Sequence, residues 1–445
     1  MRDDYFKDVH DLVTTISEGM KGVGPFFIDK DFEEVGPQRV DHWKVLMGIF
    51  AHVGGRNLLA VGNPGSGKTS YATIINSLVT ALPYDLFDFL KIQGHPEQTH
   101  EKMIGRPDLG KLDVEGVVWH PSIHLPGLTL DELNRLPPGK QAILMEFIRT
   151  GRAEYLGKYF TTGKIPFFAT LNPSGEGIYP VSDPFYDRFD ISLEFRIGSS
   201  VYLDSTTTAS INVSEQLEDL TMMDHIIEKI SDKEMSRNDK VKSFAEYQRR
   251  FRKKLSLPTI ESIPKGGLKT QFSADATMYL RCVFDEINLS AKYGENRSED
   301  HLDESNHNGA YASSNILGAI STRAWDSTKY FAGMLALYLG ESEVSYDHVA
   351  SILPYTLSHR LHFSDQFAAQ FHDEARLRGE REPIDLTRRV LGQIKHNYDD
   401  IKDSLAHLDQ YLAGNHEFED HVQQIISGPI SDHPLLATYM KLVKA

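Results

Sequence analysis

Near the start of the chain, eight consecutive residues have the types and spacing of a phosphate-binding loop. The segment Gly62-Asn63-Pro64-Gly65-Ser66-Gly67-Lys68-Thr69 matches the pattern G-x-x-x-x-G-K-[ST], and Ser70 follows it. Glycine permits backbone conformations that other residues avoid, which brings N–H groups close to phosphate oxygens. Lys68 would reach the β- and γ-phosphates, and the Thr69 hydroxyl would hold Mg²⁺. We therefore expect this segment to bind a nucleoside triphosphate rather than to form a glycine-rich turn without chemistry.

Two carboxylates follow a second apolar run and supply the acidic groups that a nucleotide-hydrolysing site needs. Leu128-Thr129-Leu130 precedes Asp131 and Glu132. Asp131 would support Mg²⁺ together with Thr69. Glu132 would polarise the attacking water as a general base. An Asp-Glu pair alone often marks only the start of a helix, but the phosphate-binding pattern upstream favours the functional interpretation.

Asn172 stands directly after the apolar run Phe167–Leu171 and before Pro173. An Asn-Pro pair by itself is a common turn starter. Ligands of open α/β sheets bind outside the carboxyl ends of the strands, so an amide at this point could orient the lytic water. We therefore expect Asn172 to belong to the same site.

An α/β layout with a parallel sheet is the arrangement that would position these groups. Apolar runs alternate with helical patterns from Val35 to about Gly198. Helical spacing of apolar residues then dominates from Ile316 to the end, whereas Ala291–Ser314 is polar and resembles a mobile loop or disordered insertion. The predicted strands are Asn57–Val61, Asp88–Ile92, Leu128–Leu130, Pro166–Leu171 and Asp190–Phe195, and the predicted helices of this part include Lys68–Leu82 and Lys140–Thr150.

Composition narrows the class of protein. A chain of 445 residues is long enough for two or three domains, and its 40% hydrophobic content is ordinary for a globular protein. Its single cysteine, Cys282, excludes a disulfide framework, so we expect a cytoplasmic protein. The first residues do not have the pattern of a signal peptide, and no apolar run is long enough to span a membrane.

Charge argues against a surface built for nucleic acid, because the formal net charge is −16. The basic run 248–254, which contains one aromatic residue, is a local exception. It could contact nucleic acid or an acidic partner, although a solvated helix face is the more common explanation of such a run. His120 and His124 are four residues apart but lack a carboxylate that would complete a zinc motif, so we expect them to be structural.

Several further motifs, in chain order, resemble those of MoxR-type AAA+ ATPases. The stretch from Asp131 to Gln141 is similar to the family's D-E-[IL]-N-R-x-P-P-x-x-Q. Residues 169–173 resemble A-T-x-N-P, which carries the family's sensor 1. The remaining matches are Val35-Gly36 with Gln38, Lys91-Ile92-Gln93 with Ile104-Gly105, Gly177 with Tyr179-Pro180, Asp187-Arg188-Phe189, Gly318–Arg323 and His359-Arg360.

The resemblance implies roles for residues that the other patterns leave unassigned. Val35 and Gly36 would lie near the adenine, which makes ATP the expected nucleotide. Arg188 would be an arginine finger for the neighbouring subunit's ATP, and Arg323 would be sensor 2, reaching the γ-phosphate from the lid. A guanidinium suits both roles because it stays charged and grips phosphate oxygens in a fork. A finger in trans implies a homo-oligomeric ring, expected to be a hexamer.

The implied domains are a lead-in over 1–34, an AAA+ α/β core over 35–198, an enlarged or inserted segment over 199–315, an all-α lid over 316–362 and a helical extension over 363–445. The resemblance also implies that the ring remodels or activates a partner protein, with von Willebrand factor A proteins as the usual partners. Thr322 stands where the family usually has proline, and the segment 199–315 has little of the family pattern.

Two other functions fit part of the sequence. A nucleic-acid-directed NTPase of the McrB or ring-helicase type shares the acidic motif and the arginine finger. Against it stand the net charge and the dipeptides Pro137-Pro138 and Asn172-Pro173. A degenerate nucleotide-binding scaffold is disfavoured because the lysine, acidic pair, asparagine and arginines are all present.

Overall fold

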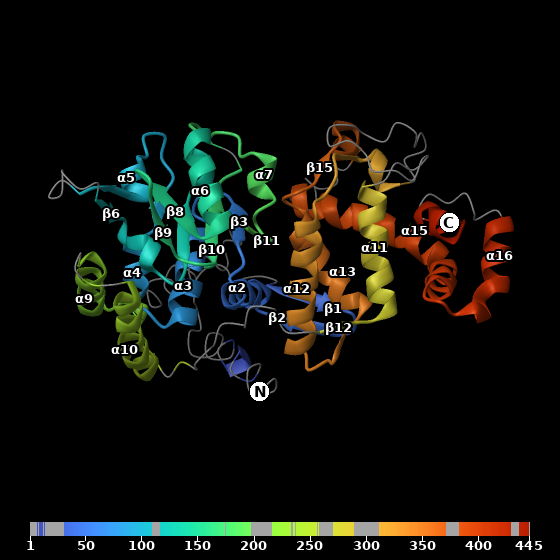
Figure 1. Ribbon diagram of the computed structural model, residues 1–445, viewed down its shortest axis with the longest axis horizontal. Coiled ribbons are helices and arrows are strands. Elements are labelled where there is room, and N and C mark those ends of the chain that lie inside the picture. The colour runs from blue at the N-terminus through green and yellow to red at the C-terminus, as the bar shows by residue number, and fades with distance from the viewer. Residues whose placement is uncertain are drawn as a thin grey trace, which may run out of the picture. The chain divides into compact units, whose positions relative to one another are not determined.

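The computed structural model divides into two compact units, residues 1–268 and 269–445 (Figure 1). The structure describes residues 31–108, 116–173, 175–196, 216–232, 237–255, 270–288, 311–370, 382–428 and 436–444, with a few single positions besides. The division falls inside the segment 199–315, and the five predicted domain ranges stay predictions. Most of Ala291–Ser314 lies outside the described residues.

A five-stranded parallel sheet forms the centre of the first unit, in the order β11-β3-β10-β7-β4. Its strands are β3 (Leu58–Gly62), β4 (Ile92–Gln93), β7 (Leu128–Asp131), β10 (Phe167–Leu171) and β11 (Ile191–Phe195). Strand β10 lies between β3 and β7, pairing Phe168 with Leu58 and Phe167 with Leu128. Because all five strands are parallel, β3, β7 and β10 end on the same side of the sheet, and the segments that follow them lie together there.

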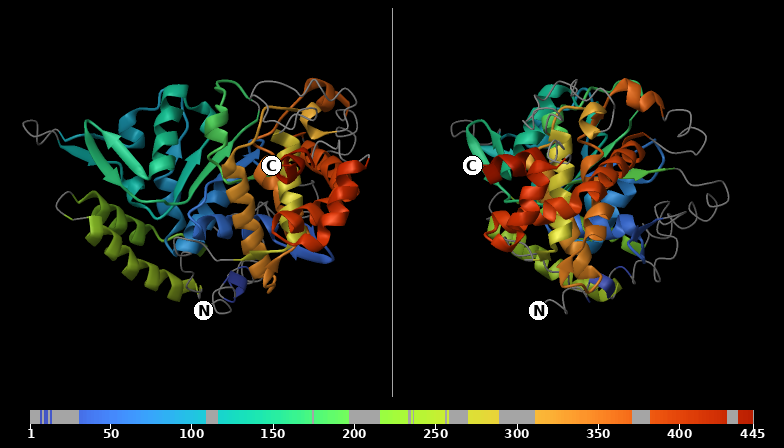
Figure 2. Two further views of the ribbon diagram at one scale, coloured as in Figure 1. Left: turned by 45° about the vertical axis from the view of Figure 1, so that its right-hand side comes forward. Right: turned by 90° about the vertical axis from the view of Figure 1, so that its right-hand side faces the viewer.

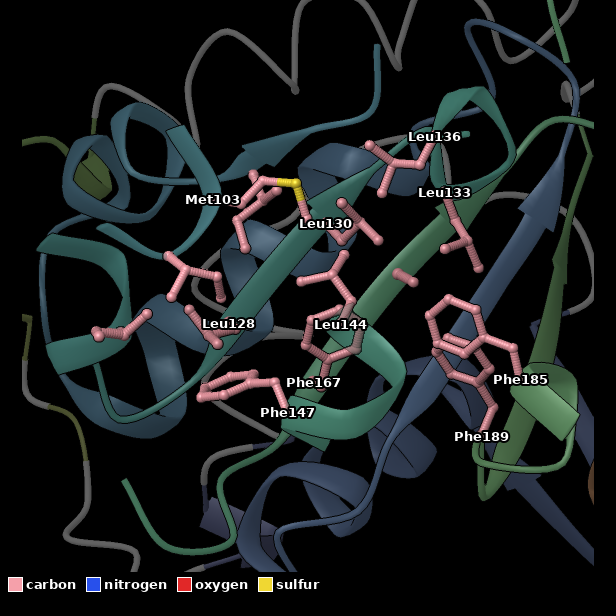
Figure 3. Close-up of a cluster of buried hydrophobic side chains, with 14 of the residues drawn as sticks. Met103, Leu128, Leu130, Leu133, Leu136, Leu144, Phe147, Phe167, Phe185 and Phe189 are labelled. Carbon is pink, nitrogen blue, oxygen red and sulfur yellow. The ribbon is translucent and has the colours of Figure 1, made fainter. Parts of the chain in front are cut away.

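Alternating side chains of these strands pack against helices on both faces of the sheet. Helix α3 (Lys68–Thr80) covers one face, where its Asn76 Nδ2 donates to Thr129 Oγ1 of β7 at 3.0 Å. On the other face, Leu128 and Leu130 pack with Leu144 of helix α6 (Pro138–Thr150) (Figure 3). Both β7 leucines are at most 1% exposed. The apolar runs of the sequence thus correspond to strands whose two faces are both buried.

The prediction of a strand over Asp88–Ile92 is wrong for most of its length. Residues Tyr84–Phe89 form helix α4, and strand β4 begins only at Ile92. Leu86 and Leu90 are buried at helical spacing whereas Phe89 is 66% exposed, so the apolar residues follow a helical period rather than that of a strand. The other four predicted strands are confirmed to within a residue or two.

Smaller elements surround this core. The two-stranded ladders are β1 (Phe32–Val35) with β2 (Gln38–Asp41), β5 (Gly105–Pro107) with β6 (Val117–Trp119), and β8 (Arg152–Tyr155) with β9 (Lys158–Thr161). The remaining helices are α2 (Trp43–Val53), α5 (His100–Met103), α7 (Asp183–Tyr186), and the 3₁₀ segments η4 (Pro121–His124) and η5 (Leu133–Arg135). His120 caps η4 by accepting from Ser122 N, and the His124 ring lies against Phe160.

A helical hairpin of α9 (Leu220–Ser231) and α10 (Arg237–Leu255) packs beside α4 and η4 (Figure 2). Asp219 N donates to Asp85 Oδ2 at 2.8 Å, and Gln248 Nε2 donates to Thr80 O at 2.7 Å. The basic run 248–254 lies in the second half of α10.

The second unit is mostly helical, with two short ladders, β12–β14 and β13–β15. Helices α11 (Ala274–Asn288), α12 (Thr322–Tyr338), α13 (Tyr346–Leu357) and the long α15 (Glu382–Leu412) pack together, followed by α16 (Glu419–Ser427) and α17 (Ala437–Lys444). The remaining short elements are β12 (Gln271–Phe272), η6 (Ala312–Ser314), β13 (Ile316–Leu317), β14 (Glu343–Val344), β15 (His362–Phe363) and η7 (His416–Phe418). Among the described helices of the chain, none is long and apolar enough to cross a membrane.

Candidate functional site

The glycine-rich loop connects strand β3 to helix α3 and depends on glycine at particular points. Gly65 and Gly67 have φ angles of 77° and 83°, a region that other residues adopt only with strain. A Cβ on Gly62 would lie 2.2 Å from the carbonyl oxygen of Phe195, so no larger residue fits there. The loop continues directly into the first turn of α3. The free N–H groups at the start of a helix and the helix dipole favour an anion there.

The Lys68 ammonium group is held inside this loop. Its side chain is buried, and Nζ donates to the carbonyl oxygens of Gly62 and Asn63, at 2.8 Å each. Burial lowers the pKa of Lys68, and the nearby carboxylates of Asp131 and Glu132 oppose that shift. Both carbonyl contacts are ones that a phosphate oxygen could replace, because an ammonium group binds either kind of acceptor.

The other loop residues support its shape. Ser66 Oγ donates to Asn63 O at 2.8 Å, and Pro64 is exposed at the tip. Ser70 lies in the first turn of α3, where its side chain hydrogen-bonds with Tyr84.

Asp131 ends strand β7 beside the loop. Its Oδ1 atom accepts from the hydroxyl groups of Thr69 and Thr170, each at 2.6 Å. Three oxygen-bearing side chains from α3, β7 and β10 therefore meet at one point of the carboxyl edge. Hydroxyl and carboxylate oxygens are the ligands of a hard cation such as Mg²⁺, so Thr69 and Asp131 fit that ion in combination with phosphate oxygens.

Glu132 follows Asp131 in a left-handed backbone conformation, with φ 55° and ψ 55°. Its Oε1 atom accepts from Asn172 Nδ2 at 3.0 Å, and its Oε2 atom lies 3.2 Å from Arg135 Nε. Its backbone N donates to Thr170 Oγ1 at 2.9 Å. A non-glycine residue in this region is strained, and such strain concentrates at functional sites. Both carboxylate oxygens thus contact side chains, one from the acidic motif and one from the residue after β10.

Close approach of the neighbouring chain segment helps to hold this turn. Gly94, after β4, donates its N–H to Asp131 O at 2.7 Å. A Cβ at Gly94 would lie 2.0 Å from the carbonyl oxygen of Glu132. Only glycine therefore allows β4 to approach the acidic pair this closely.

The Arg188 backbone lies at the amino ends of the parallel strands, opposite the ends where the acidic pair stands. Its carbonyl oxygen accepts from Asn57 Nδ2 at 2.8 Å, and Asn57 immediately precedes β3. Asp190 N and Asn57 O are also hydrogen-bonded at 2.8 Å, which fixes the start of β11 at the same end. Strand β3 separates Asn57 from Gly62, a span of about 16 Å at strand rise. The Arg188 backbone is therefore anchored at the amino ends of the strands, away from the glycine-rich loop of the same chain.

The remaining predicted site residues are Val35, Gly36 and Arg323. Val35 and Gly36 form the end of β1 and the turn to β2, where Gly36 has a φ of 56°. Arg323 belongs to the second unit, in the first turn of α12, and its backbone N donates to the N-cap Ser321 Oγ at 3.1 Å. The proposed roles of these three residues stay predictions.

Sequence reasoning did not assign roles to Thr170, Arg135 and Gly94, which all touch the acidic pair. Thr170 could have been noticed as a hydroxyl near the end of an otherwise apolar strand. Arg135 is three residues after Glu132 on a tight turn, a spacing at which side chains meet. The need for glycine at position 94 comes from the pairing of β4 with β7, which no local pattern shows.

Comparisons with known proteins agree with this architecture. No protein-family model matches the chain. The "Uncharacterized protein YifB" of Escherichia coli (strain K12) is 26% identical over 189 aligned positions, which cover 34% of this chain and 37% of YifB. The chain thus matches little more than a third of that relative. A solved structure from Cytophaga hutchinsonii ATCC 33406, described as a "putative ATPase", superimposes with a TM-score of 0.55 at 18% identity, covering 89% of this chain and 95% of that one.

The solved structure supports the fold. The parallel sheet with the glycine-rich loop after β3, followed by the helical second unit, is an α/β core with a helical C-terminal region, the fold that this solved structure shares. The prediction of fold class is confirmed.

Proposed function

We propose that this chain is a Mg²⁺-dependent ATPase that converts ATP and water to ADP and phosphate. The observation that carries the proposal is the meeting of Lys68, Thr69, Asp131, Glu132 and Asn172 at one edge of the sheet. Three separate segments of the chain supply these five side chains. The C. hutchinsonii protein of the same fold supports the proposal through its description as an ATPase.

Each side chain has one task in the proposed reaction. Lys68 neutralises charge on the β- and γ-phosphates, while Thr69 and Asp131 hold Mg²⁺, which supplies further charge neutralisation when bound. Glu132 takes a proton from the attacking water, and Asn172 orients that water against the γ-phosphate. The hydrogen bond of 3.0 Å from Asn172 Nδ2 to Glu132 Oε1 supports these two roles.

We further propose that hydrolysis needs a neighbouring copy, because Arg188 is anchored about one strand length from its own phosphate loop. A neighbour's Arg188 would complete each site, and in GTPases such a finger contributes on the order of 10³–10⁵ in rate. The motifs that resemble MoxR proteins support a ring, with a hexamer as the implied size. They also imply that Arg323 closes over the γ-phosphate and Val35 and Gly36 contact adenine.

We propose that the ring uses this cycle to remodel or activate a partner protein, for which the resemblance implies a von Willebrand factor A protein. Contacts to the γ-phosphate exist only before hydrolysis, so their loss can release one conformation for another. Stimulation of phosphate release by a purified von Willebrand factor A protein would support this partner, and unchanged turnover would contradict it.

The substitution Glu132→Gln tests the catalytic assignment. It removes the base but keeps the size of the side chain, so we expect turnover to fall about 10²–10⁴-fold while ATP still binds. Phosphate release measures the first effect and the fluorescence of a labelled ATP analogue the second. The same change at the exposed Glu97 is the control and should leave both unchanged. Unaltered turnover in Glu132→Gln would refute the role of Glu132.

A nucleic-acid-directed NTPase is the second candidate, and helix α10 is the observation in its favour. Arg249, Arg250 and Lys253 are exposed on this helix. If nucleic acid is the substrate, DNA or RNA should stimulate phosphate release, and salt should weaken that stimulation steeply. Stimulation by a protein partner alone would exclude this candidate.

A further inference from the structure

We infer that Asn134 couples the nucleotide site of each chain to the segment that presents Arg188. This inference rests on the proposed function. Asn134 Nδ2 donates to the carbonyl oxygen of Asn172 at 2.7 Å, and the carbonyl oxygen of Asn134 accepts from Tyr179 N at 2.6 Å. We name these two consecutive hydrogen bonds the Asn134 bridge. It joins the residue that contacts Glu132 to the loop that leads toward Arg188.

The Asn134 bridge is buried and closely packed. Asn134 is only 5% exposed, so its hydrogen bonds are shielded from competing water. Gln141 of α6 supports the same loop, because its Nε2 atom donates to Leu136 O at 2.8 Å and to Pro180 O at 3.3 Å. Movement of the Asn172 backbone is thus transmitted to residues 179 and 180 through short contacts.

The segment from Tyr179 to Arg188 is held as a body. Phe185 is fully buried and stacks on Phe189, with ring centroids 5.7 Å apart, in the same cluster as Leu144 of α6 (Figure 3). The far end of the segment is fixed by the bond from Asn57 to the Arg188 carbonyl. The segment therefore connects the carboxyl end of β10 with the amino end of β3.

A purely structural explanation would have the Asn134 bridge only tie down a surface loop. Two features favour coupling over that explanation. The bridge binds Asn172, whose side chain contacts the Glu132 carboxylate. The loop that it holds ends at the arginine proposed to serve the neighbour. A change of Asn172 on binding the γ-phosphate would then reach the finger of the same chain.

Amide hydrogen exchange tests the inference without relying on turnover. In the full-length Glu132→Gln chain, ATP should slow exchange in residues 175–189, including the Tyr179 amide, because a phosphate contact fixes Asn172. The further change Asn134→Ala should abolish this slowing while the labelled ATP analogue still binds. The same slowing with Asn134→Ala, or no slowing in the Glu132→Gln chain despite bound ATP, would overturn the inference.

Two additional variants separate coupling from general damage. Asn76 is also buried and bonds Thr129 on the opposite face, so Asn76→Ala controls for the loss of a buried amide and should keep the ATP-dependent slowing. If Asn134→Ala does not fold, Gln141→Met removes the support of Pro180 at similar volume, and we expect it to reduce the slowing. A full response in Gln141→Met would then count against the inference. Failure of every chain to bind ATP would instead refute the proposed function, and the inference with it.

Discussion

At the scale of single residues, a carboxyl group in the second unit is buried with an unusual balance of contacts. Glu286 Oε1 accepts from Ala312 N at 2.8 Å and from Asn397 Nδ2 at 2.9 Å, whereas Oε2 is buried and has no hydrogen-bond partner among the residues that the structure describes. Burial raises the pKa of Glu286 to about 7, although both hydrogen bonds act to lower it. Between about pH 4.5 and 7, the folded chain therefore keeps a proton on Glu286 that the unfolded chain has released.

This balance predicts a pH-dependent stability. Between the unfolded pKa near 4.5 and the folded value of about 7, the folded state binds more protons, so stability falls as pH rises through this window. Glu286→Gln keeps the neutral form at every pH. We expect it to stabilise the second unit at pH 8 by at most about 3 kcal/mol, with little effect at pH 4.5. Urea unfolding at both pH values measures the difference.

The control for this prediction is Glu343→Gln, because Glu343 is exposed on β14. Its stability should differ little from that of the original chain at both pH values. A Glu286→Gln chain that gains nothing at pH 8 would show that Glu286 is charged in the folded protein.

The candidate site could be predicted from sequence only where its residues follow a motif. The loop and the acidic pair have fixed spacing along the chain, so they are visible in one dimension. The contacts of Thr170 and Gly94 depend instead on the order of strands, which places β10 and β4 on either side of β7. The residues around Thr170 and Gly94 in the sequence therefore do not show that these two contact the acidic pair.

At the scale of elements, the close approach of β4 to β7 requires a residue without a side chain at position 94. Gly94→Ala would place a methyl group against the backbone of Glu132, which cannot move away as a flexible side chain could. We expect a loss of about 1–3 kcal/mol in stability and a lower rate of ATP hydrolysis. Thermal unfolding and phosphate release measure the two effects.

Gly139→Ala provides the matched control for Gly94→Ala. Gly139 is exposed in the first turn of α6, and a Cβ there would meet nothing within 4 Å. Alanine favours helix over glycine, so stability should be equal or slightly higher. Equal behaviour of the two variants would contradict the importance of close approach at Gly94.

Prediction of elements failed where two periodicities compete over a few residues. The run from Tyr84 to Leu90 is apolar enough for a strand, yet it forms α4 because the buried residues Leu86 and Leu90 are four apart. Strands β3 and β10 contain no charged residue and have turn residues after them, and the sequence predicts them well. Short elements are decided by what they pack against, which lies outside their own sequence.

At the scale of the whole molecule, the position of Arg188 predicts how mixtures of inactive chains behave. Chains with Arg188→Ala lack the proposed finger, and chains with Glu132→Gln lack the proposed base, so we expect each to be nearly inactive alone. When both are assembled together in equal amounts, half of the sites keep Glu132 and half of their neighbours keep Arg188. About one quarter of the original activity should therefore return in a head-to-tail assembly.

Mixed assembly must be shown separately, for example by pull-down of one tagged variant with the other. Activity in pure Arg188→Ala, or no recovery in mixtures that do co-assemble, would contradict a finger supplied in trans. Arg323→Ala provides a comparison, since a sensor that acts within its own chain should not be rescued by Glu132→Gln.

The bond between Asn57 and the Arg188 carbonyl has one further consequence. It fixes the Arg188 backbone at the amino ends of the strands, whereas the glycine-rich loop follows the carboxyl end of β3. If a neighbouring copy completes each site through a head-to-tail contact, as proposed, that contact repeats from copy to copy. Such a series either closes on itself or continues as a filament, and only closure gives every copy both a donor and an acceptor of the arginine.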